Sequence, residues 1–575
     1  MKDSKKLFWL LLSFTIFGLF FINKAYHIDD PFTITIAKAI GEHFIRVPQV
    51  YQGDFIFMGD VYHNPLLLGY YFAPIIKIFQ DKEVWLHLFY LPFSWLSILA
   101  MYFLSRRFIG RGIFAAGLLA VSPVFVVMSQ NIMLDIPLLA FFLGALAAFI
   151  YGVDKDNKRL LYLSAVLAGL AILTKYSGIM VVFIMFSYAL LSGKKKYSLF
   201  LLIPAGMLLL WCLHNFIFYQ HVYLLDSLLK KGSNLSPEII QIRAFAVLSF
   251  LSGASICVIF LIPYLLSRKI NRLFFILSLP LGLCPFLIKG FSSGFNNYLG
   301  KRFYFSGYSS IEKSMLAVFF VASFFIILMI LNAGVTHFFK KDRNKDNLFL
   351  SLWFMALLIF TIIVQFVAAR FVLLLFPPMF LLIVKELSLN KDVSFNLRSK
   401  YIVFAIGAAI VISGLLSAGD YQLSGAYRDF VVSLKKKLPT RNDIYFCQSS
   451  FDTNLCYGYA YYLRKYYPQA AKNEIEASLN KDGGFIYVVP AGAFLSPVFH
   501  ENCSDYFQGL TYKKDLIGSF RYQGNVFLHD RRFHAGFYSH DWGLLPFYIS
   551  FKEAPLEIFE VYQITSERPV NMPAS

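Results

Sequence analysis

Two adjacent carboxylates, Asp29 and Asp30, stand in the first polar interruption of the chain, a few residues after its first hydrophobic run. Adjacent like charges repel, so one carboxyl of such a pair has a raised pKa unless cations or hydrogen-bond donors compensate. A carboxylate of this kind is suited to accept a proton from an attacking hydroxyl group. Asp29 is therefore the candidate general base, with Asp30 beside it. The alternative is that the pair forms a plain surface turn.

Three basic residues far apart in the chain could neutralise negative charge on a departing phosphate: Lys175, Arg302 and Arg370. Each alone also has a plain reading, because basic side chains snorkel at helix ends or lie solvated in loops. His63 and Asp135 complete the set of candidates. Asp135 is the hardest to explain as scaffold, because a carboxylate costs about 2.5–3.5 kcal/mol at the centre of a membrane helix and less near its end.

The composition places these residues on a membrane scaffold. The chain has 575 residues, of which 58% are hydrophobic and only 15% charged, whereas soluble domains carry about 25% charged residues. The net charge of +19 could indicate nucleic-acid binding. The Lys and Arg residues, however, cluster in short loops between apolar runs of membrane-spanning length, as in multi-pass membrane proteins.

Loop charges set the expected topology. Residues 65–79 are short for a span and contain Pro74 and Lys77, which is typical of an interfacial or re-entrant segment. If this segment does not cross, every loop expected on the cytoplasmic side holds at least three Lys or Arg residues, as the positive-inside rule requires. The spans are then expected at about 7–23, 84–104, 112–129, 132–151, 160–174, 176–192, 197–218, 243–266, 271–288, 313–337, 348–367, 369–386 and 400–418.

The expected fold class is a polytopic α-helical membrane protein of about 13 transmembrane helices with a small C-terminal external α/β domain. Residues 1–418 would form the transmembrane domain, in which 24–83 is the first external loop with interfacial helices. Residues 419–575, which are polar and mix short strand-like runs with a helix-like stretch, would form the external domain. Cys447 and Cys456 could pair there if the compartment is oxidising. This topology, chosen without the candidate residues, places all of them on the external side.

Several short motifs resemble those of one family of membrane enzymes. Asp29-Asp30-Pro31 resembles an acidic pair in a first external loop, with Asp30 where that family usually has Glu. Further matches are His63-Asn64-Pro65-Leu66, Leu134-Asp135-Ile136-Pro137, Leu173-Thr174-Lys175 and the segment from Arg370 to Pro377. In this order they are similar to the protein O-mannosyltransferase and aminoarabinose (lipid A) transferase family, within the GT-C superfamily of membrane glycosyltransferases. The resemblance is good over 24–190, thin through the middle and present again near 370.

The resemblance implies a glycosyltransferase that moves a sugar, with inversion, from a polyprenyl-phosphate donor to an acceptor hydroxyl or phosphate on a glycan, lipid or protein. It also implies a plasma (inner) membrane location, with a cytoplasmic N-terminus and the active site and C-terminal domain on the periplasmic or extracellular side. Asp29 would be the base. Asp30, His63, Asp135, Lys175, Arg302 and Arg370 would bind the substrates. Whether a divalent cation lies near Asp29, Asp30 and Asp135 stays open.

Two rival functions remain. A transporter or flippase of lipid-linked sugars would carry ionisable residues near the bilayer midplane and inverted repeats, whereas the charges here fall at one face and no repeat is visible. A non-catalytic scaffold would depend on the 419–575 domain and not on Asp29 or Asp135.

Overall fold

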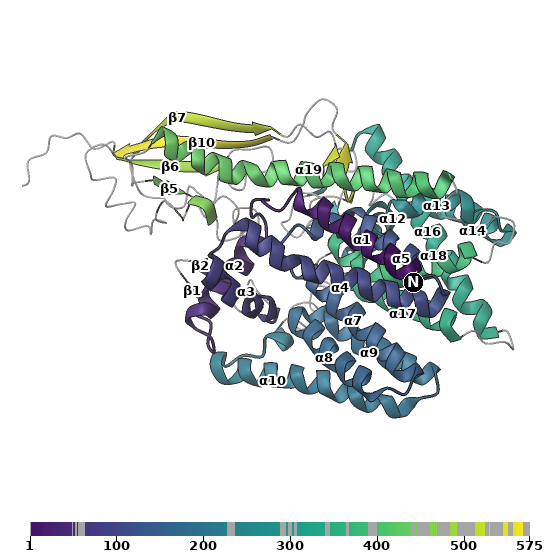
Figure 1. The fold of residues 1–575 in the computed structure, drawn as a ribbon. Helices are drawn as coiled ribbons and strands as arrows, with labels where there is room; N and C mark the ends of the chain where they lie inside the picture. The colour runs from purple at the N-terminus through teal and green to yellow at the C-terminus, as the bar shows by residue number, and fades with distance from the viewer. Residues whose placement is uncertain are drawn as a thin grey trace, which may run out of the picture.

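The computed structural model describes most of the helical part of the chain and parts of the C-terminal third. The described residues are 2–48, 50–51, 54–55, 64–226, 236–287, 295–296, 302–303, 308–339, 345–363, 367–388, 400–438, 444–446, 461–463, 465, 467, 484–490, 512–523, 528–529, 544–549 and 556–566. Figure 1 shows a body of packed helices, with a small sheet at one end of the long helix α19. Cys447 and Cys456 lie outside the described residues.

The helices before residue 220 account for the first half of the helical body. They are α1 (Lys2–Leu19), α2 (Asp30–Glu42), α3 (Leu67–Phe79), α4 (Glu83–Ile109), α5 (Gly112–Val121), α6 (Pro123–Met128), α7 (Asp135–Asp154), α8 (Lys158–Thr174), η1 (Tyr176–Ile179), α9 (Met180–Leu191), η2 (Lys195–Leu201) and α10 (Leu202–Tyr219). The second half consists of α12 (Pro237–Gly253), α13 (Cys257–Leu265), α14 (Lys269–Leu283), η3 (Cys284–Leu287), α16 (Ser310–Phe339), α17 (Lys345–Ile363), η5 (Ala369–Leu375), α18 (Phe376–Ser388) and α19 (Lys400–Lys437).

All of the expected spans fall on helical segments, but several of these segments are interrupted. The span expected at 112–129 breaks between α5 and α6, where Ser122 is extended (φ −71°, ψ 131°). The ring of Pro123 disfavours a helical conformation at the residue before it, which explains the break. Among the described residues, eight helices are long and apolar enough to cross a membrane, or nine if α12 and α13, bent by 79°, form one span. The fold class is confirmed, with fewer uninterrupted spans than expected.

The segment at 65–79 forms α3, a helix of 13 residues that is too short to cross a bilayer core. It packs against α2, which was also expected as an interfacial helix. The contact is close because Gly69 has no side chain: a Cβ there would lie 2.7 Å from Ile36 and 2.8 Å from Ile40. The two helices form one layer of the first external segment.

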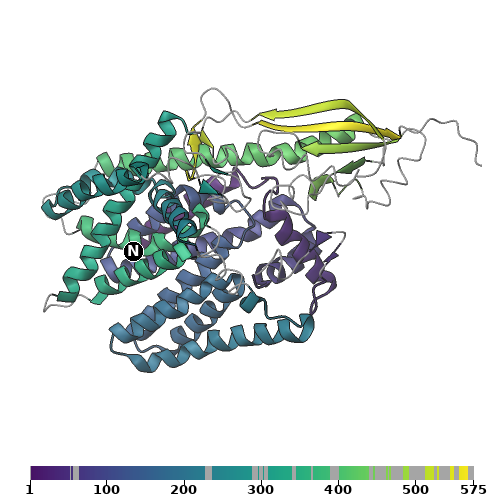
Figure 2. The same cartoon turned by 180° about the vertical axis from the view of Figure 1, so that it is seen from behind.

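The helix expected to end at 418 instead continues without a break to Lys437. Its C-terminal part packs on a four-stranded sheet of order β5 (Ile444–Phe446), β6 (Phe485–Pro490), β10 (Leu556–Ser566) and β7 (Tyr512–Gln523). Strands β5 and β6 are parallel and the other pairs antiparallel. The ring of Phe430 on α19 stacks on that of Phe559 on β10 at 4.1 Å. Figure 2 shows the same sheet at the end of α19 from behind.

Three short pairs complete the described strands: β1 (Val50–Tyr51) with β2 (Asp54–Phe55), β3 (Phe295–Asn296) with β4 (Arg302–Phe303), and β8 (Leu528–His529) with β9 (Tyr548–Ile549). The two longest strands, β7 and β10, were not expected from the sequence. Their pairing register shifts between Val561 and Tyr562. Such a bulge breaks the alternation of apolar and polar residues by which strands are recognised.

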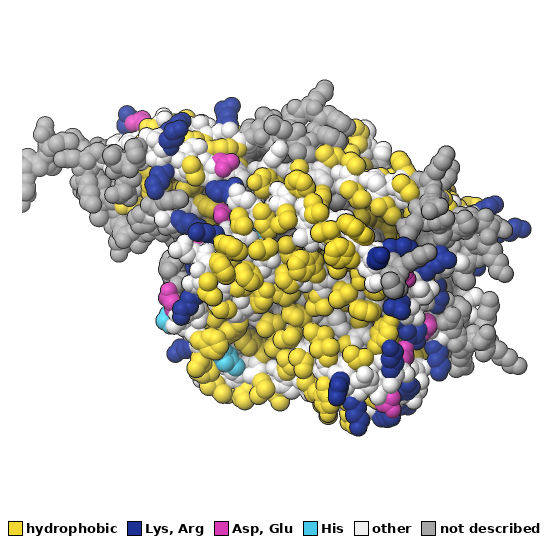
Figure 3. All heavy atoms as spheres, in the orientation of Figure 1, with side chains coloured by type: hydrophobic (Ala, Val, Ile, Leu, Met, Phe, Trp, Pro, Cys, Tyr) yellow, Lys and Arg dark blue, Asp and Glu magenta, His cyan; other side chains and the backbone are white. Residues whose placement is uncertain are grey.

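The helical body has the surface of a membrane protein. Figure 3 shows hydrophobic side chains over its visible face, with Lys and Arg gathered along the edges. Large side chains on α10 and α14 are exposed, among them Leu209, Leu210 and Ile276 at 60% or more. At one end, Arg107 pairs with Asp154 and Asp346, the latter at 3.1 Å. Three loops expected on the cytoplasmic side therefore meet in space.

Candidate active site

The acidic turn lies where the chain leaves α1 and enters α2. Asp29 precedes the first turn of α2, and Pro31 follows at a position where the missing backbone N–H costs no hydrogen bond. Asp29 does not cap the helix with its carboxylate, which is directed to another partner. Ile28 has φ +53°, a left-handed conformation that costs a residue with a Cβ about 1–2 kcal/mol. Surrounding contacts must hold the turn in this form.

Four candidate residues meet in one group, here called the carboxylate–cation cluster: Asp29, Asp135, Lys175 and Arg370. Arg370 Nη2 lies 3.1 Å from Asp29 Oδ2, and Arg370 Nε lies 3.3 Å from Asp135 Oδ2. Lys175 Nζ donates a hydrogen bond to Asp135 Oδ1 at 2.9 Å. Arg370 therefore bridges the two carboxylates, and Asp135 bridges the two cations.

Each member of the cluster is positioned at the end of a helical segment. Asp135 is the first residue of α7, Lys175 follows the last turn of α8, and Arg370 lies in η5. The turn after Lys175 is tight: Gly178 N–H donates to the carbonyl of Lys175 at 2.8 Å, and a Cβ at Gly178 would lie 2.4 Å from the Ala171 carbonyl oxygen. The Phe371 ring stands 3.8 Å from Lys175 Nζ and adds a cation–π contact.

Asp29 differs from its partners in accessibility. About a third of its side chain is accessible (34%), against 7% for Asp135 and 9% for Arg370. Burial of the carboxyl group raises the pKa of Asp29; Asp135 and Asp30 raise it further, and the charges of Arg370 and Lys175 oppose the shift. A reachable carboxylate with a raised pKa beside two cations can accept a proton while the cations stabilise an anion.

Asp30 lies apart from this cluster although it is the next residue. It has no exposed surface, its Oδ1 accepts a hydrogen bond from the backbone N–H of Ile132 at 2.8 Å, and its Oδ2 accepts one from the N–H of His27 at 3.3 Å. Ile132 is three residues before Asp135, so Asp30 ties the acidic turn to the loop that carries Asp135. The structure thus gives both carboxylate oxygens of Asp30 partners within the protein, and its role in substrate binding stays a prediction.

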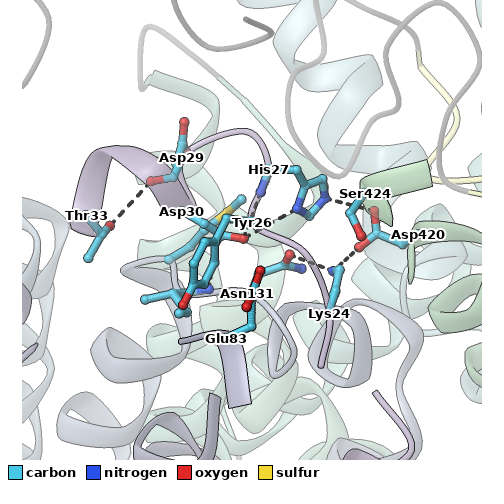
Figure 4. A network of polar contacts seen from close by, with 12 residues as sticks. Lys24, Tyr26, His27, Asp29, Asp30, Thr33, Glu83, Asn131, Asp420 and Ser424 are labelled. Carbon is cyan, nitrogen blue, oxygen red and sulfur yellow. Dashed lines mark hydrogen bonds and ion pairs between the residues drawn. The ribbon is translucent and has the colours of Figure 1, made fainter. Parts of the chain in front are cut away.

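A second, fully buried group adjoins Asp30; it is called the Lys24–Asp420 network and comprises Lys24, His27, Asn131 and Asp420. Lys24 Nζ pairs with Asp420 Oδ2 and donates to Asn131 Oδ1 at 2.7 Å. His27 Nε2 lies 3.0 Å from Asp420 Oδ1, and its Nδ1 lies 3.4 Å from Asp30 Oδ2. Figure 4 shows Asp30 directed into this network and the Asp29 carboxylate outside it.

Sequence reasoning missed the Lys24–Asp420 network. Lys24 was read as a loop residue, and Asp420 fell beyond the expected end of the last span. A lone carboxylate inside a long helix was the available signal, because an unpaired buried charge is costly and requires a partner. Nothing local to Asp420 names that partner, which lies 396 residues away.

The side chains of the remaining two candidates lie outside what the structure describes. His63 lies outside the described residues, and only the backbone of Arg302, in β4, is described. Among the residues that the structure does describe, no group of three His, Cys, Asp or Glu side chains is arranged to hold a metal ion. Arg370 and Lys175 lie against three of the four carboxylate oxygens of Asp29 and Asp135.

Comparisons with solved structures give several similar chains. ArnT from Cupriavidus metallidurans bound to undecaprenyl phosphate is 14% identical, with 96% of this chain and 97% of that chain covered and a TM-score of 0.43. The oligosaccharyltransferase AglB from Archaeoglobus fulgidus, in complex with an inhibitory peptide and a dolichol-phosphate, is 15% identical, with 78% and 63% covered and a TM-score of 0.43. Arabinofuranosyltransferase AftD from Mycobacteria is 12% identical, with 97% and 40% covered and a TM-score of 0.40.

A search of curated proteins finds no match. Residues 63–219 match the family model for dolichyl-phosphate-mannose-protein mannosyltransferases. This range contains Asp135 and Lys175 and ends with α10. Over these residues, the match confirms the resemblance to protein mannosyltransferases that the motifs predicted.

Proposed function

We propose that this protein is a glycosyltransferase that takes a sugar from a polyprenyl-phosphate donor and transfers it, with inversion, to an acceptor hydroxyl group. The observation that carries the proposal is the carboxylate–cation cluster. The cluster brings an accessible carboxylate together with two cations from distant parts of the chain. Asp29 and Arg370 are 341 residues apart in the sequence. The family matched by residues 63–219 is described by a dolichyl-phosphate-mannose donor, which is the same class of lipid phosphate.

The proposed reaction is a single displacement. The acceptor oxygen attacks the anomeric carbon as the bond from that carbon to the phosphate oxygen breaks, and this accounts for inversion. Asp29 accepts the hydroxyl proton. The bond electrons pass to the leaving polyprenyl phosphate, whose added negative charge is stabilised by Arg370 and Lys175. The sugar, the proton and the charge are all accounted for without a further reactant.

The resting contacts suggest how the donor prepares the base. Arg370 pairs with Asp29 at 3.1 Å, and its charge opposes the rise in the pKa of Asp29. In this proposal the donor phosphate takes Arg370 from Asp29. The carboxylate then loses its cation and binds a proton more tightly.

The proposal places the cluster on the external side of the plasma membrane, with the N-terminus in the cytoplasm. The support is the separation of charges: the loops that carry Arg107, Asp154 and Asp346 meet one another, and the cluster is built from different ends of the same helices, the first residue of α7 and the residue after α8. The basic loops belong on the cytoplasmic side by the positive-inside rule.

The test uses purified full-length protein and a labelled polyprenyl-phosphate sugar. Asp29→Asn should abolish turnover while the protein still inserts and accumulates, because the amide cannot accept the proton. Asp156→Asn, the same change at an exposed loop residue, is the matched control. Normal turnover in Asp29→Asn would rule out the assigned base. In liposomes, net flux of the lipid-linked sugar without a new glycosidic bond would identify a transporter instead.

A further inference from the structure

Asp420 on α19 pairs with two residues of the segment that leads into the acidic turn. The two oxygens of Asp420 take different partners: Oδ2 pairs with Lys24 and Oδ1 with His27 Nε2 at 3.0 Å. These partners are three residues apart and precede Asp29 by five and two residues. A single side chain therefore fixes two points of the backbone that delivers the candidate base.

The Lys24–Asp420 network is fully buried. Lys24, His27, Asn131 and Asp420 each have 0% exposed surface. A buried charge is retained only where it is paired and hydrogen-bonded, and removal of one partner leaves the other uncompensated. Lys24 has both Asp420 and Asn131 as partners. The network is therefore a closed contact of the folded protein, out of reach of a substrate.

The segment it holds is strained. Ile28, between His27 and Asp29, is a β-branched residue at φ +53°, and such a conformation persists only where neighbouring contacts over-determine it. The contacts lie on both sides of Ile28: His27 is held by Asp420, and Asp30 by the N–H of Ile132. Asp29 stands between these anchors and points to Arg370.

Other residues after 419 hold the same segment. Arg428 on α19 donates to the carbonyl of Asn23 at 3.2 Å. The backbone N–H of Tyr26 donates to the hydroxyl of Tyr462 at 2.8 Å. Contacts from the C-terminal third thus run along residues 23–27, in addition to the pair made by Asp420.

We propose that Asp420 is a positioning residue: through Lys24 and His27 it holds the Lys24–Asp30 segment in the strained form that presents Asp29 to Arg370 and the substrates. This inference rests on the proposed function, in which Asp29 is the base. It gives α19, which carries the C-terminal sheet, a direct part in setting the geometry of the reaction. Asp420 touches no substrate in this scheme and exchanges no proton with one.

The test compares kcat and KM in purified full-length variants. Asp420→Asn keeps the size of the side chain and removes its charge. Its kcat should fall about 100-fold, as small misplacements of a catalytic group do, with KM for the polyprenyl-phosphate sugar unchanged. Addition of Lys24→Gln should restore most of the kcat, because two neutral amides can pair without a buried charge. Asp156→Asn, at a 62% exposed residue away from this segment, should behave as wild type.

The outcomes separate the hypotheses. Wild-type kcat in Asp420→Asn would overturn the inference, and so would a double variant that accumulates normally but stays inactive. A rise in KM in place of the fall in kcat would make Asp420 a determinant of binding and also overturn it. If Asp420→Asn does not accumulate, the double variant alone carries the test. Asp29→Asn is assayed in parallel: normal turnover there overturns the proposed base, whereas low turnover there with a wild-type Asp420→Asn overturns only the positioning role.

Discussion

The carboxylate–cation cluster and the Lys24–Asp420 network have similar chemistry and different surroundings. Each pairs carboxylate and cationic side chains from distant parts of the chain; Asp29 belongs to the first, and the next residue, Asp30, adjoins the second. Asp29 retains 34% of its side-chain surface, whereas Lys24 and Asp420 retain none. The comparison teaches that residue type does not separate a reactive group from a structural one. The two are distinguished by the accessibility of the side chain and by whether all of its polar atoms have partners within the protein.

Arg370 gives the largest expected effect, because it joins both carboxylates of the accessible cluster. Arg370→Gln removes the guanidinium charge that faces Asp29 and Asp135. In the proposed reaction this charge stabilises the leaving phosphate. The value of kcat/KM should fall by about 100- to 1,000-fold, the usual cost of one stabilising donor. Initial rates with labelled donor measure this. Lys196→Gln, which removes an exposed charge, is the control. If kcat/KM falls no further in Arg370→Gln than in Lys196→Gln, Arg370 has no part in the mechanism.

The pH dependence of the rate tests whether the accessible cluster titrates through Asp29. A general base works only when it is deprotonated, so kcat/KM should rise with pH. Because burial raises the pKa of Asp29, this rising limb of the pH profile should lie above the ordinary aspartate pKa of about 4. Asp135 raises that pKa as well. In Asp135→Asn the limb should therefore move to lower pH, at a reduced rate. A limb that keeps its position would contradict this coupling.

Asp30 tests the buried side of the comparison. Asp30→Asn keeps an acceptor for the N–H of Ile132 and loses the charge that faces His27. It should lower the free energy of unfolding by about 1–3 kcal/mol, the range for a disturbed buried hydrogen bond to a charged group. Thermal unfolding in detergent, followed beside activity, measures this. An inactive Asp30→Asn of full stability would move Asp30 into the reactive cluster.

Asp81, in neither group, gives the smallest expected effect. Its Oδ2 accepts a hydrogen bond from Lys38 at 2.7 Å and lies 3.2 Å from Lys465. Burial raises the pKa of Asp81, but hydrogen bonds from Lys38 and Tyr461 and the two Lys charges outweigh it and hold the pKa well below its ordinary value. A lowered pKa stabilises the fold above the ordinary aspartate value, and this stabilisation is lost as the pH falls below it.

Asp81→Asn should therefore cost about 1 kcal/mol near neutral pH, the net worth of a hydrogen bond, and leave kcat unchanged. Unfolding measured at neutral pH and at about pH 2–3, between the ordinary and the lowered pKa of Asp81, checks the sign: the difference between wild type and variant should shrink in acid. A fall in kcat would show that cations around any partly buried carboxylate suffice for reactivity, and would break the comparison.

The sequence by itself determined the class of protein and named all four residues of the carboxylate–cation cluster as candidates. Apolar runs of membrane length, basic loops and short polar motifs are local signals. They located most of the helices, among them the short α3, and the candidates Asp29, Asp135, Lys175 and Arg370. These signals survive because a lipid environment imposes hydrophobicity on spans and sends charge to their ends. The tertiary structure alone decided which partner each charge takes.

The side chains of the adjacent residues Asp29 and Asp30 point in different directions at the start of α2, because successive residues of a helix are about 100° apart around its axis. The partner of Lys24 comes from α19, 396 residues away. The same holds for β7, where the register with β10 skips Ile517 and so interrupts the alternation of side chains along the strand. Such pairings depend on which distant segments come close together in space. The residues near Lys24 or Asp30 in the chain hold no information about this.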